Sequence, residues 1–118
     1  MVGFTSMEIS HYEIAPAKVV VSVAGKVSMG SESEQITTLV SDLLHKGKRT
    51  IIFNLANVTK IDSTGIGRFI SSYNQVDAAG AEMRMAEAPG FVFQAFHVSR
   101  LDTVFRFFPT VDEACKAG

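Results

Sequence analysis

The sequence is poor in several features that would mark a specialised class of protein. It contains a single cysteine, Cys115, which cannot form an internal disulfide and suits a reducing compartment. The formal net charge of -1 gives no electrostatic argument for nucleic acid or an anionic membrane surface. No apolar run approaches the roughly 20 residues of a membrane span, and the N-terminus lacks the pattern of a secretory signal. We therefore expect a cytoplasmic protein with no membrane insertion and no nucleic-acid partner.

Motifs for nucleotide and metal chemistry are also missing. No Gly-rich phosphate loop ending in Lys-Ser or Lys-Thr occurs, and Gly65-Ile66-Gly67 lacks the third glycine of a dinucleotide fingerprint. The chain shows no cluster of metal-ligating residues along its length. We therefore expect no cofactor, no metal ion and no enzymatic activity of its own.

What the sequence does contain is enough for one globular domain. Its 118 residues are near the usual size of a single domain, and 47% of them are hydrophobic. There is no linker, internal repeat or low-complexity segment. Residues 1–6 show no clear pattern and are expected to be disordered, so the predicted domain is 7–118.

The clearest pattern lies between Arg49 and Gly80. Residues 51–55 form a nearly continuous apolar run, which predicts a strand buried on both faces. The period then changes to that of a helix, with apolar residues at i, i+3, i+4 and i+7, namely Ile66, Phe69, Ile70 and Tyr73. Gly80 supplies a C-cap.

The rest of the chain alternates between the two patterns. Strands are predicted at about 7–14 and 18–24, as an antiparallel hairpin, at 81–86, half-exposed, and at 103–108. Helices are predicted after a capping box at Ser31–Glu34, at about 89–98, and after Thr110, which again has Glu three residues later. This order predicts a single α/β domain with a mixed, mostly parallel sheet of about five strands packed by about four helices. The strand order stays open.

A short polar joint, Asp62-Ser63-Thr64-Gly65, connects the buried strand to its helix and is the candidate functional site. The Ser63 hydroxyl is expected near the surface, at the positive end of the helix dipole. It is either a plain N-cap, worth about 1 kcal/mol, or a residue with a special role. Asp62 either orients that hydroxyl and contacts a partner or satisfies backbone N–H groups. Thr64 is either a second acceptor or a cap.

Two glycines near this joint need a separate reason. Gly65 and Gly67 each cost about 1 kcal/mol in a helix, so we expect a close backbone approach there. That approach serves either a docked protein or packing against a neighbouring strand.

A hydrolase site is the alternative of a different class. The nucleophile elbow needs glycine two residues before the serine, where this chain has Ile61. The possible bases, His11, His45 and His97, fall in three separate predicted elements with no spacing that brings them to Ser63. Hydrolysis is therefore disfavoured.

The buried strand followed by Asp-Ser-Thr-Gly at a helix start resembles the STAS domain, of the bacterial anti-sigma factor antagonist type. The resemblance runs from about Glu8 to Ala117. It implies that Ser63 is phosphorylated by a partner kinase, and that residues around it bind that partner. In relatives an acidic residue, thought to help dock the kinase, often stands at the place of Ser28. The serine here is either part of a modified interface or a solvated loop residue.

The resemblance implies a function and a rival to it. Unphosphorylated, the chain would bind a serine-kinase anti-sigma factor and so release a sigma factor, and phosphorylation at Ser63 would end that binding until a phosphoserine phosphatase reset it. Alternatively, the domain is a scaffold of a transporter or lipid-transport complex whose Ser63 is never modified. The phenylalanine-rich segment 91–108 should be mostly core, with one or two exposed side chains available for a partner. The oligomeric state stays open.

Overall fold

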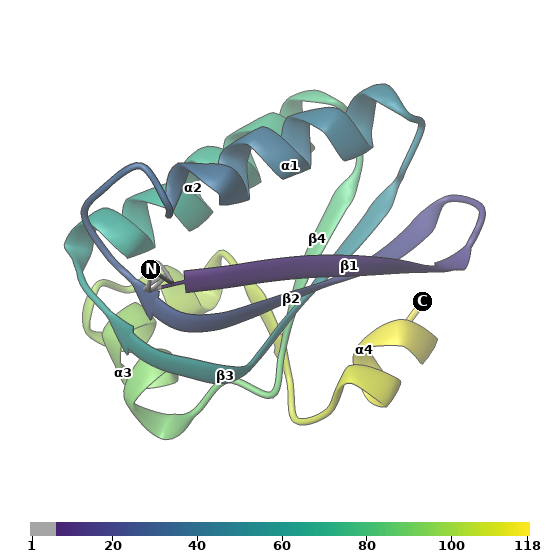
Figure 1. Ribbon diagram of the computed structural model, residues 1–118. Coiled ribbons are helices and arrows are strands. Elements are labelled where there is room, and N and C mark those ends of the chain that lie inside the picture. The colour runs from purple at the N-terminus through teal and green to yellow at the C-terminus, as the bar shows by residue number, and fades with distance from the viewer. Residues whose placement is uncertain (1–6) are drawn as a thin grey trace.

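The computed structural model describes residues 7–118, and the expected disorder of residues 1–6 lies outside that range. Five strands and the helices between them alternate along the chain, as Figure 1 shows. In order, the elements are β1 (Met7–Ala15), β2 (Lys18–Val27), α1 (Glu34–His45), β3 (Thr50–Ile61), α2 (Ser63–Ala78), β4 (Glu82–Ala86), α3 (Gly90–Val98), the 3-10 helix η1 (Leu101–Thr103), β5 (Arg106–Phe108) and α4 (Val111–Lys116).

The strands form one mixed sheet in the order β1-β2-β3-β4-β5. β1 is antiparallel to β2, whereas each later neighbour is parallel, which confirms the predicted hairpin and the mostly parallel sheet. Each parallel pair is joined by a helical crossover, as parallel strands require.

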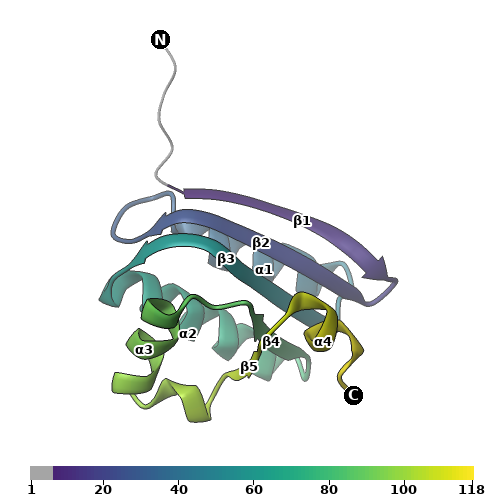
Figure 2. The same cartoon turned by 90° about the horizontal axis from the view of Figure 1, so that it is seen from below.

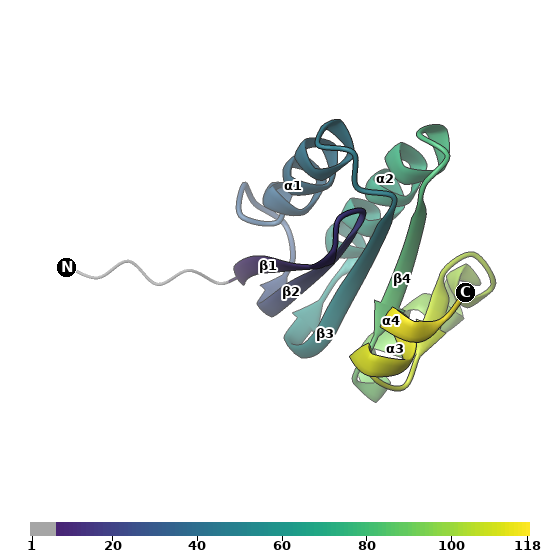
Figure 3. The same cartoon turned by 90° about the vertical axis from the view of Figure 1, so that its right-hand side faces the viewer.

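The helices cover the two faces of the sheet unequally. α1 and α2 lie side by side over one face, and α4 lies against the other (Figures 1 and 3). The larger core fills the space beneath α1 and α2, and α3 extends it through Val92 and Phe96. The smaller core joins α4, through Ala114, to Val20 and Ile52. In the described part of the chain, no helix is long and apolar enough to cross a membrane.

Aromatic contacts fix α2 to the rest of the core. The ring of Phe69 lies edge-on to Phe53 of β3, with centroids 5.2 Å apart, and its centroid is 5.9 Å from that of Phe96 in α3. Edge-to-face pairs of this kind add about 0.5–1.5 kcal/mol beyond the burial of their area. The helix that follows the polar joint is therefore anchored in the core.

The buried strand predicted at residues 51–55 is confirmed, since Ile51, Ile52, Phe53 and Leu55 are fully buried in β3. The buried face of α2 is rotated around the helix axis relative to the predicted apolar stripe. Its buried residues are Gly65, Phe69, Ser72 and Val76, whereas Ile70 is exposed. Small residues at two of these positions let the helix backbone approach the sheet, so bulk alone did not mark the packed face.

The strand predicted at 81–86 is present, but the prediction that it is half-exposed is wrong. Both Met83 and Arg84 of β4 are buried, because α4 covers the face that alternation assigned to solvent (Figure 2). Arg84 is accommodated there by donating to Glu82 and to the carbonyl oxygen of Ala114, 2.6 Å away. The strand predicted at 103–108 is shortened to Arg106–Phe108, because η1 precedes it.

Candidate functional site

Asp62 starts α2. It has an extended backbone at the end of β3, and its side-chain Oδ1 accepts a hydrogen bond from the Gly65 N–H at 2.9 Å. This is the arrangement of an N-cap. The interpretation of Ser63 as the plain N-cap is therefore wrong, because Asp62 occupies that position and leaves Ser63 as the first helical residue.

The second carboxylate oxygen of Asp62 reaches a different part of the chain. Oδ2 accepts from the backbone N–H of Met29, at 3.3 Å, in the loop 28–33 between β2 and α1. The pKa of Asp62 is held below its ordinary value, chiefly by the hydrogen bond from Gly65. Partial burial acts in the opposite direction and raises the pKa. The hydrogen bonds from Met29 and Thr64 and the positive charge of Lys60 lower it further. Of its two interpretations, Asp62 is seen to satisfy backbone N–H groups.

Ser63 carries the more exposed of the two hydroxyls in the joint. Its side chain is exposed, and within residues 7–118 it takes part in no hydrogen bond of the structure. It lies at the N-terminal end of a 16-residue helix, where backbone N–H groups and the dipole favour an anion. Thr64, the next residue, is half-buried. The geometry therefore exposes the Ser63 hydroxyl at a place where a phosphate would be tolerated.

The two glycines have different surroundings. A Cβ on Gly65 would lie 2.0 Å from the carbonyl oxygen of Val27 in β2, so only glycine allows α2 to approach the sheet there. A Cβ on Gly67 would meet nothing within 4 Å. Packing explains Gly65, whereas Gly67 leaves a small open patch of helix surface beside Ser63.

A second link between the loop and α2 was missed by sequence reasoning. Nε of Arg68 donates to the Ser33 hydroxyl at 3.0 Å, and Nη2 donates to the Gly30 carbonyl at 3.3 Å. Ser33 is itself buried and donates to the same carbonyl at 3.1 Å. One signal could have found Arg68. It has no carboxylate three or four residues away on its own helix, so its partner had to come from elsewhere.

The loop brings Ser28 to the same end of the domain. Ser28 is half-buried, directly after β2, and its neighbour Met29 is 79% exposed although its backbone is held by Asp62. The structure thus gathers Ser28, Asp62, Ser63, Thr64 and Gly65 around the start of α2, with Gly67 slightly further along the helix. We call this set of six residues the Ser63 surface.

The histidines do not complete a hydrolase site. His45 bonds to the Ser41 carbonyl at 2.8 Å, and His97 pairs with Asp102 at 2.9 Å. His11 lies on β1. Among the residues described, no hydrogen bond joins any of the three to Ser63.

The mixed five-stranded sheet with its helical crossovers defines a class of fold, a single α/β domain that several solved structures share. The family model of the STAS domain matches residues 9–114. The chain therefore belongs to the STAS domain family.

Several solved structures share this fold at low sequence identity. An anti-sigma factor antagonist from Mycobacterium paratuberculosis is 24% identical, with a TM-score of 0.78 and coverage of 93% of this chain and 92% of that one. The anti-sigma factor antagonist SpoIIAA in its unphosphorylated form is 20% identical, with a TM-score of 0.77 and coverage of 92% of this chain and 93% of that one. Bacillus SpoIIAA in the phosphorylated form is also 20% identical, with a TM-score of 0.71 and coverage of 92% of this chain and 96% of that one. A sulfate transporter family protein from Wolinella succinogenes is 14% identical, with a TM-score of 0.76 and coverage of 87% and 85%.

Proposed function

We propose that this chain is an anti-sigma factor antagonist that binds a serine-kinase anti-sigma factor when unphosphorylated, releases a sigma factor, and is switched off by phosphorylation at Ser63. The observation that supports this most is the exposed Ser63 hydroxyl, which is not used to cap α2 because Asp62 provides the cap. The similarity to a protein solved in both unphosphorylated and phosphorylated forms adds support. A phosphoserine phosphatase would reset the switch, and the cytoplasm is its proposed location.

The local charges suit such a switch. A phosphate would add a charge of about -1.5 to -2 at Ser63, the residue that follows the acidic Asp62 in the chain. The helix N-terminus tolerates that anion within the domain, while an acidic or apolar partner surface would be repelled. A hundredfold loss of affinity corresponds to about 2.8 kcal/mol, which one phosphate can supply.

The exposed atoms around the hydroxyl suggest how a partner is held before phosphorylation. Met29 offers an exposed apolar side chain on a loop fixed by Asp62 and Arg68, and Gly67 leaves the helix surface open to close approach. A partner that packs on these residues would place its phosphoryl donor near Ser63. Phosphorylation would then alter the centre of its own docking surface.

The test is phosphopeptide mapping and intact mass after incubation with ATP and serine kinases of the anti-sigma type. We expect one added phosphate, on Ser63, in the wild type and in Thr64→Ala, and none in Ser63→Ala. The phosphorylated protein should bind the kinase at least about a hundredfold more weakly than the unmodified one. Equal phosphorylation of Ser63→Ala would contradict the site.

The second candidate is a scaffold module whose Ser63 is never modified. The similarity to a sulfate transporter family protein favours it, since that protein has the same fold over 87% of this chain. In that case no candidate kinase modifies Ser63, and the domain instead binds a transport component with the same affinity in the wild type and in Ser63→Asp.

A further inference from the structure

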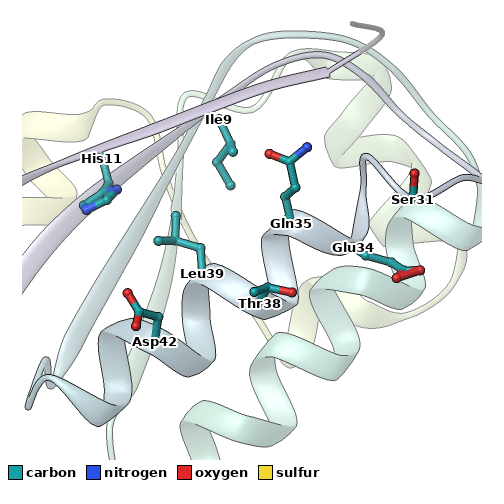
Figure 4. A pocket seen from close by; sticks show the side chains of 8 residues that line it. All are labelled: Ile9, His11, Ser31, Glu34, Gln35, Thr38, Leu39 and Asp42. Carbon is teal, nitrogen blue, oxygen red and sulfur yellow. The ribbon is translucent and has the colours of Figure 1, made fainter.

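Most basic side chains of this domain already have a partner within residues 7–118. In the groove between β1 and α1, which Figure 4 shows, the Asp42 carboxylate pairs with Lys46 at 3.1 Å. The other paired lysines and arginines bond to a carboxylate, a hydroxyl or a backbone carbonyl. Within the described chain, the basic residues with no hydrogen bond or ion pair are Lys26, Lys60 and Arg100.

Lys26 and Lys60 stand opposite each other on the neighbouring strands β2 and β3, and both are exposed. A shift of register lies immediately before them. Gly25 pairs with Val58, so an unbroken register would place Thr59 opposite Lys26, and the shift places Lys60 there instead. Bulges of this kind re-aim side chains and are frequent beside functional sites. Because like charges directly opposite each other are destabilising, the stability of the fold does not account for the pair.

The lysine pair lies at the end of the sheet that carries the Ser63 surface. The pKa of Asp62, the cap of α2, is lowered chiefly by the Gly65 N–H and also by the positive charge of Lys60. Val27 is buried beneath α2, so its neighbour Lys26 projects from the other face of the sheet. α4 packs on that face near the start of β2, whereas Lys26 lies near its end. Both lysines are therefore accessible to a partner that reaches Ser63.

We propose that Lys26 and Lys60 bind an acidic segment of the kinase that docks on the Ser63 surface. The inference rests on the proposed function and adds to it the chemistry of the partner. Carboxylates of that segment would supply the counter-charges that the described chain does not. Charged contacts at the rim of an interface act mainly on the rate of association and on its dependence on salt.

This partner chemistry accounts for binding and for release. At the joined ends of β2 and β3 the charged side chains are Lys26, Lys60 and Asp62, two positive and one negative. A phosphate of about -1.5 to -2 on Ser63 would reverse the sign of their sum. An acidic segment is attracted in the first state and repelled in the second. A basic segment would be held more tightly after phosphorylation, which is the opposite of the proposed switch.

The test measures how fast the kinase that modifies Ser63 associates with the whole chain. Lys26→Glu and Lys60→Glu should each lower the association rate at least about tenfold at low salt, with little change in the dissociation rate. The difference from the wild type should shrink as salt is raised. Each substitution also replaces a like-charge pair by an opposite pair, so Tm should rise slightly. Slower association with a higher Tm excludes loss of folding as its cause.

Lys116→Glu is the matched control, since it changes the net charge by the same amount. Lys116 is an exposed residue of α4, and its pair with Asp112 is exposed as well, so losing that pair should cost little. α4 lies at the opposite end of β2 from Lys26, because Lys18 at the start of β2 donates to the Cys115 carbonyl at 2.8 Å. The association rate of this variant should stay close to that of the wild type.

Acetylated hexaglutamate tests the same contact without a kinase. Added to the whole chain, it should shift the amide NMR signals of Lys26 and Lys60. The shifts should be lost in Lys26→Glu and kept in Lys116→Glu, and acetylated hexaglutamine should cause none. As a competitor, hexaglutamate should slow the association of the kinase with the wild type more than with Lys26→Glu.

The outcomes separate this inference from the proposed function. If a kinase modifies Ser63 but associates with Lys26→Glu and Lys60→Glu as fast as with the wild type, the lysine contact is wrong and the switch stands. An equal loss of rate in Lys116→Glu, or hexaglutamate shifts that map away from the two lysines, would also overturn the contact. A chain that no kinase modifies on Ser63 would overturn the proposed function, and this inference with it.

Discussion

The starts of α1 and α2 both carry serine, but the two hydroxyls have opposite environments. At α1 the N-cap position is Ser33, which makes no capping bond, is 1% exposed and is bonded to Gly30 and Arg68. At α2 Asp62 provides the cap, and the Ser63 hydroxyl is exposed and makes no hydrogen bond within residues 7–118. A serine at a helix start is thus structural or available depending on which neighbour takes the cap.

The difference follows from how the chain enters each helix. α2 begins directly after β3, so Asp62 keeps an extended backbone and its carboxylate can reach the Gly65 N–H. α1 begins after a turn in which the Glu34 N–H donates to the Ser31 carbonyl at 3.2 Å. That turn gives Ser33 a helical backbone, and its side chain bonds backwards to Gly30.

The largest effect is expected from a substitution that disrupts the packing of α2 against β2. Gly65→Ala places a Cβ 2.0 Å from the Val27 carbonyl oxygen, and backbone on both sides leaves little room to adjust. We expect a loss of about 3 kcal/mol in the free energy of unfolding, measured by urea denaturation.

Gly67→Ala is the matched control on the same helix. The added Cβ would have no neighbouring atom within 4 Å, so the gain in helix propensity should stabilise the domain by about 0.5–1 kcal/mol. If both variants lost stability equally, the close approach of α2 to β2 would not be the reason for Gly65.

The sequence was sufficient for the parts of the fold set by local pattern. The buried strand around Phe53 follows from periodicity, and it is confirmed. The helix cap predicted at Thr110 is also confirmed, because its hydroxyl accepts from the Glu113 N–H at 3.1 Å. In each case the deciding contacts lie within a few residues.

Where distant contacts decide, the same patterns gave the wrong answer. Ser31 and Glu34 have capping-box spacing, yet the helix starts at Glu34 and Ser33 is held by Arg68, 35 positions along the chain. Arg84 alternates like a solvent-facing residue but is buried under α4. For the candidate site, the sequence located the joint, but the division of roles between Asp62 and Ser63 depends on backbone geometry.

The comparison of the two serines is sharpened by substituting each with alanine. Ser33→Ala removes the acceptor of the Arg68 Nε and a buried hydroxyl that bonds to Gly30, so we expect a loss of about 1–2 kcal/mol. Ser63→Ala should change stability by less than about 0.5 kcal/mol, because its hydroxyl is exposed and makes no hydrogen bond to any of residues 7–118. Thermal and urea denaturation of both variants would measure this, and equal losses would contradict the assigned environments.

The smallest effect concerns the cap itself and depends on pH. Since the folded state lowers the pKa of Asp62, chiefly through the Gly65 N–H, the ionised carboxylate stabilises the domain above the unfolded pKa. That contribution is lost as pH falls through the folded pKa. Asp62→Asn keeps an acceptor oxygen but not the charge, so it should lower Tm at neutral pH by less than Gly65→Ala does.

The pH dependence of that difference separates charge from shape. The gap in Tm between the wild type and Asp62→Asn should narrow as the pH falls below about 4, where the unfolded carboxyl becomes protonated. Glu82, whose pKa is lowered mainly by its hydrogen bond from Arg84, and Asp102, whose pKa is lowered mainly by His97, titrate in the same acid range. Both carboxyls remain in the variant, so subtracting the two curves isolates Asp62. A gap that stayed constant down to acid pH would mean that the shape of the Asp62 side chain, and not its charge, accounts for the stability of the α2 cap.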